Sequence, residues 1–108
     1  MADCMFHPMT PEINKRRREL APGILDAWEK FSHAAFAEGA LPEKTKQLIA
    51  VAVAHTTQCP YCIRGHTKMA RIKGASDEEI MEAIWVAAEM RSGAAMAHST
   101  LAIEELSK

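Results

Sequence analysis

The sequence has few aromatic residues, no long apolar run and almost no net charge, and each absence excludes a class of protein. Only 6% of the 108 residues are aromatic, and much of the 48% hydrophobic content is alanine and methionine, which suits packed helices better than a sheet. No apolar segment reaches the ~18 residues that span a bilayer. A net charge of −1 gives no general attraction to nucleic acid or to an anionic membrane. We therefore expect a helical protein that binds neither nucleic acid nor a membrane.

The N-terminal segment, residues 1–9, has neither a hydrophobic period nor the basic, apolar and small regions of a signal peptide. We predict that it forms an arm, that residues 10–108 form a single domain, and that the protein is cytoplasmic. In that compartment cysteines more often react or bind metal than form structural disulfides. Cys4 lies in the arm and receives no role, so the chemistry depends on Cys59 and Cys62.

Prolines, glycines and capping residues divide the chain into helical segments. Thr10-Pro11 is typical of a helix start, and Pro60 should likewise occupy the first position of a helix. Ser76-Asp77-Glu78-Glu79 has the sequence of a capping box, and Ser92-Gly93 should interrupt the helix that follows. No strand–turn–strand pattern or repeat is present. The sequence therefore predicts an all-α fold with helices over residues 11–20, 24–38, 42–57, 60–73, 77–91 and 94–106.

The alanine-rich segment 42–57 is apolar on every side of the predicted helix. Residues 48–54 run without a polar side chain, a pattern that also fits a buried strand. A proline at the start, a glutamate in the first turn and the alanines within the run favour a helix. A helix that is apolar all round must be covered all round, and so short a chain offers little cover, so we predict self-association. Trp28 and Trp85 are expected to be core residues.

The segment QCPYCIRGH, residues 58–66, places two cysteines three residues apart and a histidine four residues after the second. The tetrapeptide CPYC is shared with glutaredoxins, which place it after a β-strand and need a later cis-proline loop. Here no βαβ alternation occurs, and Pro60 is the last proline of the chain. The tetrapeptide is therefore shared, but the glutaredoxin scaffold is not.

Helix geometry alone gives these residues the equipment for redox chemistry. Residues i and i+3 of a helix lie roughly 5 Å apart at Cα, within the range of a disulfide. Unpaired amides at a helix start favour a thiolate, so one of the two thiols should be more acidic than a free cysteine. His66 lies one turn beyond Cys62 on the same face, close enough to exchange a proton. Cys59, Cys62 and His66 therefore fit a two-electron thiol redox site.

Residues 41–98 contain an ordered set of features around this motif. They are the Leu-Pro start, the alanine-rich helix, C-x-x-C-x-x-x-H, the Gly74 turn before an acidic helix start, and the later Gly93 and His98. In this set the chain resembles the alkylhydroperoxidase D-like branch of the carboxymuconolactone decarboxylase family. The resemblance implies an all-α fold that assembles as trimers or hexamers. It also implies that Cys62 attacks a hydroperoxide, that Cys59 resolves the sulfenic acid as a disulfide, and that His66 relays the proton.

The chain departs from this resemblance at one position. The family's best-known peroxidases carry a glutamate twelve residues before the first cysteine, where this sequence has Gln47, which cannot ionise. Gln47, Val51 and His55 are spaced by four and share one stripe of the predicted helix. We predict that His55 takes over the proton handling with Gln47 as its hydrogen-bonding neighbour. A weaker peroxidase activity is the alternative.

The residues and the resemblance together predict a peroxidase whose Cys59–Cys62 dithiol reduces hydroperoxides and is restored by a thiol or dithiol reductant protein. The sequence calls for no metal, flavin, haem or nucleotide cofactor. A general thiol–disulfide oxidoreductase fits the same residues. A carboxymuconolactone decarboxylase-type lyase leaves the paired cysteines unexplained. A non-catalytic oligomer with zinc on His55, Cys59, Cys62 and His66, or two merely packed cysteines, are the remaining alternatives.

Overall fold

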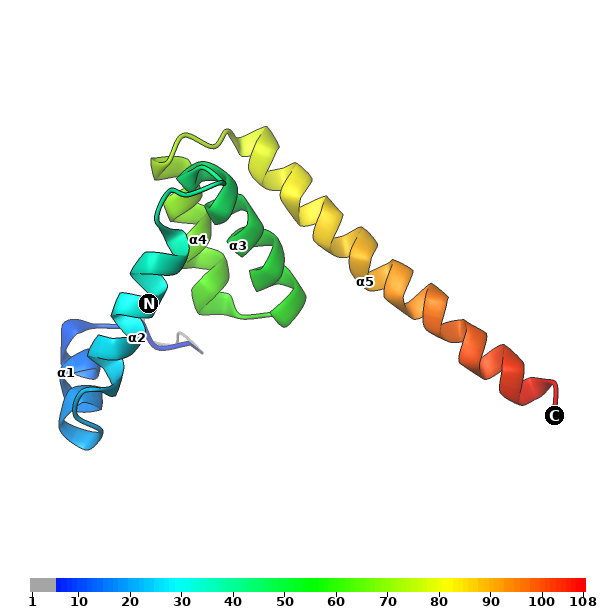
Figure 1. The fold of residues 1–108 in the computed structure, drawn as a ribbon, viewed down its shortest axis with the longest axis horizontal. Helices are drawn as coiled ribbons and strands as arrows, with labels where there is room; N and C mark the ends of the chain where they lie inside the picture. The colour runs from blue at the N-terminus through cyan, green and yellow to red at the C-terminus, as the bar shows by residue number, and fades with distance from the viewer. Residues whose placement is uncertain (1–5) are drawn as a thin grey trace. The chain divides into compact units, whose positions relative to one another are not determined.

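The computed structural model describes residues 6–108, which contain helices and no strand. The predicted all-α fold is confirmed, whereas Cys4 and the first half of the predicted arm lie outside the described residues. The chain divides into two compact units, one up to Glu43 and one over Lys44–Lys108. The helices along the chain are α1 (Pro11–Leu20), α2 (Ile24–Phe36), α3 (Glu43–Thr57), α4 (Pro60–Ile72) and α5 (Asp77–Leu106) (Figure 1). Within the described range no helix is both long enough and apolar enough to cross a membrane.

The first unit consists of α1 and α2, joined at a tight turn. Gly23 has a φ of 85° there, a left-handed backbone that a side chain would strain. Arg18 of α1 forms ion pairs with Asp26 and Glu29 of α2 at 3.0 Å each. Helix α2 ends two residues earlier than predicted, because the residue after Phe36 adopts an extended backbone. Neither helix has a fully buried side chain, so this unit has little core of its own.

The second unit packs α3, α4 and the first turns of α5 around a small apolar cluster. Its buried members are Val51, Ala70, Ala75 and Ile80, with Leu48 and Ile84 packed against them. Val51 is the largest side chain that is fully buried in the described residues. Lys44 of α3 also forms an ion pair with Glu79 of α5 at 3.0 Å. The core thus holds the three helices together but remains small.

The start of α5 has the predicted capping box. Ser76 Oγ accepts the backbone N–H of Glu79 at 3.1 Å, and the Glu79 carboxylate accepts the backbone N–H of Ser76 at 2.9 Å. These bonds satisfy amides that have no partner within the helix. The pKa of Glu79 is lowered, first by the Ser76 N–H and then by Lys44. The cap therefore fixes where α5 begins.

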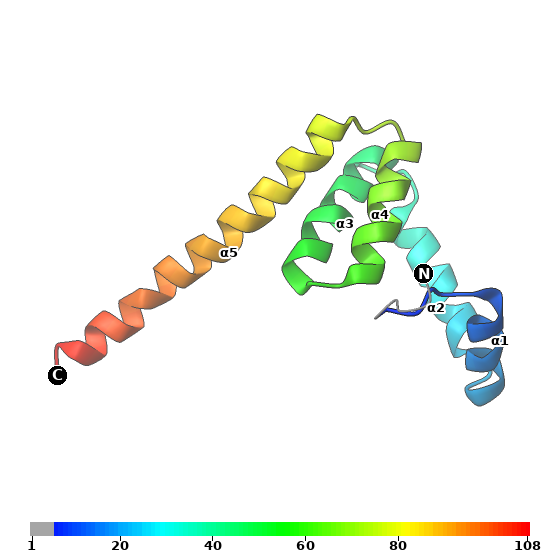
Figure 2. The same cartoon turned by 180° about the vertical axis from the view of Figure 1, so that it is seen from behind.

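Helix α5 is continuous from Asp77 to Leu106, so the predicted break at Ser92-Gly93 and the separate last helix are wrong. A glycine inside a helix costs only about 1 kcal/mol relative to alanine, and the residues that follow are mostly alanines, the strongest helix formers. Ser92 Oγ bonds the carbonyl of Glu89 at 3.0 Å, which keeps it within the helix. Figures 1 and 2 show the second half of α5 with no other helix of its unit beside it.

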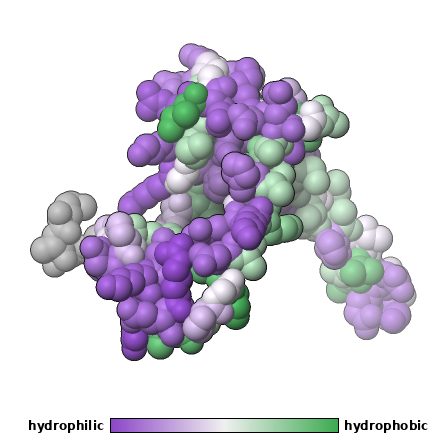
Figure 3. Space-filling view, turned by 60° about the vertical axis from the view of Figure 1, so that its left-hand side comes forward, coloured by the Kyte–Doolittle hydropathy of each residue, from purple (hydrophilic) through white to green (hydrophobic). Residues whose placement is uncertain are grey.

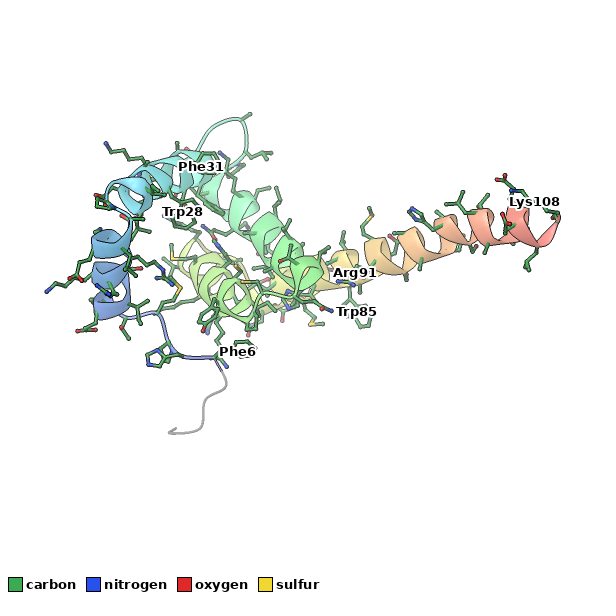
Figure 4. All side chains as sticks on the ribbon, turned by 90° about the horizontal axis from the view of Figure 1, so that it is seen from below. Phe6, Trp28, Phe31, Trp85, Arg91 and Lys108 are labelled. Atoms are coloured by element: carbon green, nitrogen blue, oxygen red, sulfur yellow. The ribbon has the colours of Figure 1, made fainter. Side chains whose placement is uncertain are left out.

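Many large apolar side chains lie exposed in the single chain. Trp28 and Trp85, which were expected in a core, are 58% and 65% exposed, so that prediction is wrong for the isolated chain. Figure 3 shows apolar side chains exposed among polar ones, and Figure 4 shows both tryptophans projecting from their helices. The physical reason is that neither unit contributes a second layer over these helices.

Candidate active site

The turn between α3 and α4 places Cys59 at a helix start. Helix α3 ends at Thr57, and Gln58 takes a left-handed backbone with a φ of 57°. Such a backbone is uncommon outside glycine and marks a turn that its surroundings hold in place. Cys59 then caps α4, with Pro60 at the first helical position, as predicted. The backbone N–H of Cys59 donates to the carbonyl of Ala54 at 3.1 Å, which fastens the turn to α3.

The thiols of Cys59 and Cys62 are half-buried and are not joined in a disulfide, and they differ in acidity. The Cys62 backbone N–H donates to Cys59 Sγ at 3.2 Å. The pKa of Cys59 is lowered, first because the Cys62 thiol donates to its sulfur and second because this N–H does. The pKa of Cys62 is raised, first because the Cys62 thiol donates its proton in a hydrogen bond to Cys59 and second because burial disfavours the charged thiolate. The pair therefore loses its first proton from Cys59, at the positive end of α4.

His66 and Gln47 form the polar contact between α3 and α4. His66 Nδ1 lies 2.8 Å from Gln47 Oε1, and Gln47 is only 5% exposed. Because an amide oxygen only accepts, Nδ1 carries the proton and Nε2 is the basic nitrogen. Glutamine brings no negative charge, and burial lowers the pKa of His66 below its usual 6.5. His66 is therefore a neutral base at pH 7.

His55 has a different partner from the one expected. Its Nδ1 lies 2.7 Å from the carbonyl of Val51, one turn back in α3. The prediction that Gln47 bonds His55 is wrong, because the Gln47 side chain points into the α3–α4 interface and bonds His66 instead. A role for His55 in proton transfer stays a prediction.

The zinc alternative finds no support in the arrangement of these side chains. Among residues 6–108, no three His, Cys, Asp or Glu side chains converge in a way that could hold a metal ion. The pattern of His55, Cys59, Cys62 and His66 is present in the sequence, but His55 turns back onto its own helix. The four side chains therefore do not form a tetrahedral site.

Arg91 makes a contact with the end of α3 that the sequence did not reveal. Its Nη1 donates to the carbonyl of Thr56 at 2.6 Å, which ties α5 to the last turn of α3, where carbonyl groups lack helical partners (Figure 4). The Arg91 guanidinium therefore contacts the carbonyl of a residue that precedes Cys59 by three positions in the sequence. Only the general preference of basic groups for helix C-termini pointed to such a contact, and it does not select a pair this distant in sequence.

Known proteins share both the sequence and the fold. "Uncharacterized protein 4 in cox locus" from Paracoccus denitrificans is 55% identical over 106 residues, which cover 98% of this chain and 95% of that protein. A solved structure from Methanobacterium thermoautotrophicum has a TM-score of 0.73 at 34% identity, covering 79% of this chain and 98% of that one. A carboxymuconolactone decarboxylase family protein from Legionella pneumophila has a TM-score of 0.66 at 34% identity, covering 92% and 94%.

The family model gives the same result over most of the chain. The model described as the carboxymuconolactone decarboxylase family matches residues 22–105, which include α2 through nearly all of α5 and both Cys59 and Cys62. The chain belongs to the carboxymuconolactone decarboxylase family, which contains the alkylhydroperoxidase D-like branch that its CxxC motif resembles.

Proposed function

We propose that this protein is a thiol-dependent peroxidase that reduces hydroperoxides through Cys59 and Cys62. The observation that carries the proposal is the unequal pair: Cys59 Sγ accepts the Cys62 N–H at 3.2 Å, and a neutral imidazole follows one turn after Cys62. One sulfur is thus ready as a thiolate, while the other holds a proton that a nearby base can take. Membership of a family that contains enzymes agrees with a catalytic role.

The first step forms a sulfenic acid on Cys62. His66 accepts the Cys62 proton, and the resulting thiolate attacks the terminal oxygen of the hydroperoxide. The O–O bond breaks, the sulfur becomes S–OH, and the departing alkoxide takes the proton from His66 and leaves as an alcohol. The lowered pKa of His66 keeps the imidazole available as a base at neutral pH, so it suits this step.

The second step closes the disulfide. The Cys59 thiolate attacks the sulfenic sulfur of Cys62, the S–S bond forms, and hydroxide leaves and takes up a proton to become water. The lowered pKa of Cys59 means that the resolving sulfur needs no further activation. A thiol or dithiol reductant protein then reduces the disulfide by exchange and returns two electrons to the pair. A cytoplasmic location would supply such reductants.

A general thiol–disulfide oxidoreductase is the second candidate, and one observation favours it. The more acidic thiol is Cys59, the first cysteine of the motif, and an acidic thiol at a helix start suits direct attack on a partner's disulfide. In this reading Cys59 attacks first and Cys62 resolves. The two candidates therefore assign opposite roles to the same two sulfurs.

Thiol titration tests the proposal and separates the two candidates. One equivalent of hydroperoxide should remove two thiols from the wild type and from a Cys4→Ser control. In Cys59→Ser, a sulfenic acid should accumulate on Cys62 and be trapped by a dione reagent, whereas Cys62→Ser should not react. Loss of no thiols in the wild type would reject the peroxidase. A mixed disulfide that forms in Cys62→Ser with a model disulfide, without any peroxide reaction, would establish the exchange enzyme.

A further inference from the structure

The last turns of α5 form an apolar helix without cover. We define the α5 tail as residues 94–106, in which every residue is exposed. Its large apolar side chains Met96, Leu101, Ile103 and Leu106 are 62–84% exposed, and the helical repeat distributes these positions over more than one face of α5. A helix with apolar side chains on several faces is stable in water only when other elements pack around it. The tail therefore needs a partner.

The first unit carries an apolar hollow of a matching kind. Between α1 and α2 lies a groove of about 420 Å³, lined by Arg17, Leu20, Ala21, Ile24, Leu25 and Trp28. Trp28 is 58% exposed, so on the order of 100 Å² of aromatic surface stays in water. Leu20 and Ile24 are 67% and 68% exposed. Such a groove accommodates one face of an apolar helix.

The groove and the α5 tail carry charges of opposite sign. The Arg17 guanidinium bonds the neutral amide of Asn14 at 2.6 Å and has no carboxylate partner among residues 6–108. The neighbouring Arg16 and Arg18, by contrast, are already paired with carboxylates. On the tail, Glu105 pairs with Lys108 at 3.1 Å, whereas the Glu104 carboxylate has no ion-pair partner in the described range. Each surface thus carries one unmatched charge, and the two have opposite signs.

The spacing of the charged and apolar residues is the same on the two helices. Arg17 and Leu20 lie three apart on α1, and Leu101 and Glu104 lie three apart on α5, so each pair shares a helix face. When the two helices run antiparallel, Leu101 faces Leu20 and Glu104 faces Arg17. The apolar and the charged contacts are then satisfied together.

We propose that the α5 tail of one copy of this chain docks in the α1–α2 groove of a second copy, with Leu101 against Leu20 and Trp28 and Glu104 paired with Arg17. The tail and the groove are different surfaces, so each chain takes part in two such contacts, either reciprocally in a pair or head-to-tail in a ring. In a reciprocal pair the two contacts add to a single interface, and stable interfaces bury roughly 800 Å² per partner. The same contact covers apolar surface on both units.

A charge exchange tests the contact. Arg17→Glu and Glu104→Lys should each raise the dissociation constant of the assembly about fivefold or more, measured by sedimentation over a dilution series, because an attraction becomes a repulsion. The double variant should return toward the wild-type value. Glu82→Lys, an exposed charge reversal on the first half of α5, is the matched control and should have no effect. A double variant that associates no better than the singles would overturn the proposal, as would a wild type that is monomeric at micromolar concentration.

Crosslinking identifies the occupant of the groove. In chains with all three cysteines replaced by serine, Leu101→Cys mixed with Leu20→Cys should form a disulfide between two different chains. Leu101→Cys mixed with Lys30→Cys, on a separate hollow of α2, should not. A Leu20→Cys/Leu101→Cys double variant that crosslinks only within one chain, at every concentration, would overturn the assignment to a second copy. Circular dichroism confirms that each variant is helical.

Discussion

Replacing Gln47 by glutamate exchanges a neutral hydrogen-bond acceptor for a charged one in contact with the imidazole of His66. The wild-type contact joins Gln47 Oε1 and His66 Nδ1 at 2.8 Å, at a position that is 5% exposed. The two side chains have nearly the same shape, so the substitution changes charge and little else. In Gln47→Glu, a carboxylate at this distance stabilises the imidazolium, and the pKa of His66 should rise.

The size of the effect follows from the geometry. An opposite charge within about 4–6 Å raises a histidine pKa by about 1 to 3 in proteins. With an effective dielectric constant of about 20, unit charges 4 Å apart attract by about 4 kcal/mol, which sets the upper limit of the increase in the His66 pKa. The cost of burying the carboxylate makes the actual increase smaller. In the wild type, burial lowers the pKa of His66 below 6.5. The variant should therefore carry an imidazolium near neutral pH where the wild type carries a neutral ring.

Nuclear magnetic resonance titration of the His66 ring protons measures this change directly, with His98 of the same chain as an internal reference. The imidazolium should also stabilise a thiolate on Cys62, so the midpoint of Cys62 alkylation should fall in a Cys59→Ser background while the pKa of His66 rises. Gln47→Met is the control, because it removes the acceptor and adds no charge. A pKa of His66 that is the same in Gln47→Glu as in the wild type would refute the contact and the reasoning built on it.

The same substitution reverses the pH dependence of stability. In the wild type the folded-state pKa of His66 lies below the unfolded value, so stability is lost as the pH falls through about 6.5 toward the lowered pKa. In Gln47→Glu the folded-state pKa lies above the unfolded value. The stabilising pair is then complete below about 6.5 and is lost as the pH rises through the raised pKa. Urea unfolding of both proteins from pH 5 to pH 8, roughly the window of histidine titration, should show the two opposite trends.

Four other predictions follow from local contacts. In Cys62→Ser the thiol that donates to Cys59 becomes a hydroxyl and the thiol–thiolate coupling is gone, so the pKa of Cys59, followed by thiolate absorbance, should change; an unchanged value would deny the pairing. Gly93→Ala should stabilise the protein by about 0.5–1 kcal/mol in urea unfolding, because the new Cβ meets only a flexible carboxylate oxygen of Glu89 at 3.4 Å; destabilisation would argue for close packing there. Ser76→Ala should cost about 1 kcal/mol through loss of the cap. Because the pKa of Glu79 is lowered in the folded state, the Glu79 carboxylate stabilises the protein at pH values above its unfolded-state pKa, and this stabilisation is lost as the pH falls through the folded-state pKa. Glu79→Gln should remove this pH dependence of stability. A pH dependence that persists in Glu79→Gln would show that another group causes it.

Local signals predicted the helix starts correctly. Thr10-Pro11, Pro60 and the Ser76 capping box each begin a helix as expected, because the residues that satisfy the first amides lie within three positions of one another. The position of Cys59 as a cap followed from the same rule. These features depend only on neighbours in sequence, so no knowledge of the tertiary structure was needed.

Features that depend on distant parts of the chain were not predictable in this way. The break at Ser92-Gly93 was wrong because one glycine weighs little against the alanines around it. The exposure of Trp28 and Trp85 depends on which surfaces lie against them, which the sequence does not state. The pairing of Gln47 with His66 depends on how α3 and α4 are aligned. Spacing by four places Gln47 and His55 on one stripe of α3. Gln47 nevertheless bonds His66 of α4, whereas His55 bonds the Val51 carbonyl of its own helix, so the shared stripe did not determine the hydrogen-bond partner of either side chain.

The exchange of glutamate for glutamine at this position changes the chemistry that the proposed site would perform. A carboxylate beside His66 would hold a charged imidazolium, which lowers the pKa of a neighbouring thiol before peroxide arrives. With Gln47, the imidazole is neutral and its proton lies on Nδ1, so in the proposed mechanism His66 takes the Cys62 proton only when the peroxide reacts. Of the two thiols in the motif, Cys59 is the one favoured as a thiolate at rest, and in the proposed mechanism it then attacks the sulfenic acid. Such a site combines a protonated attacking sulfur with an ionised resolving sulfur, and its rate should depend on the basicity of His66 more than on the acidity of Cys62.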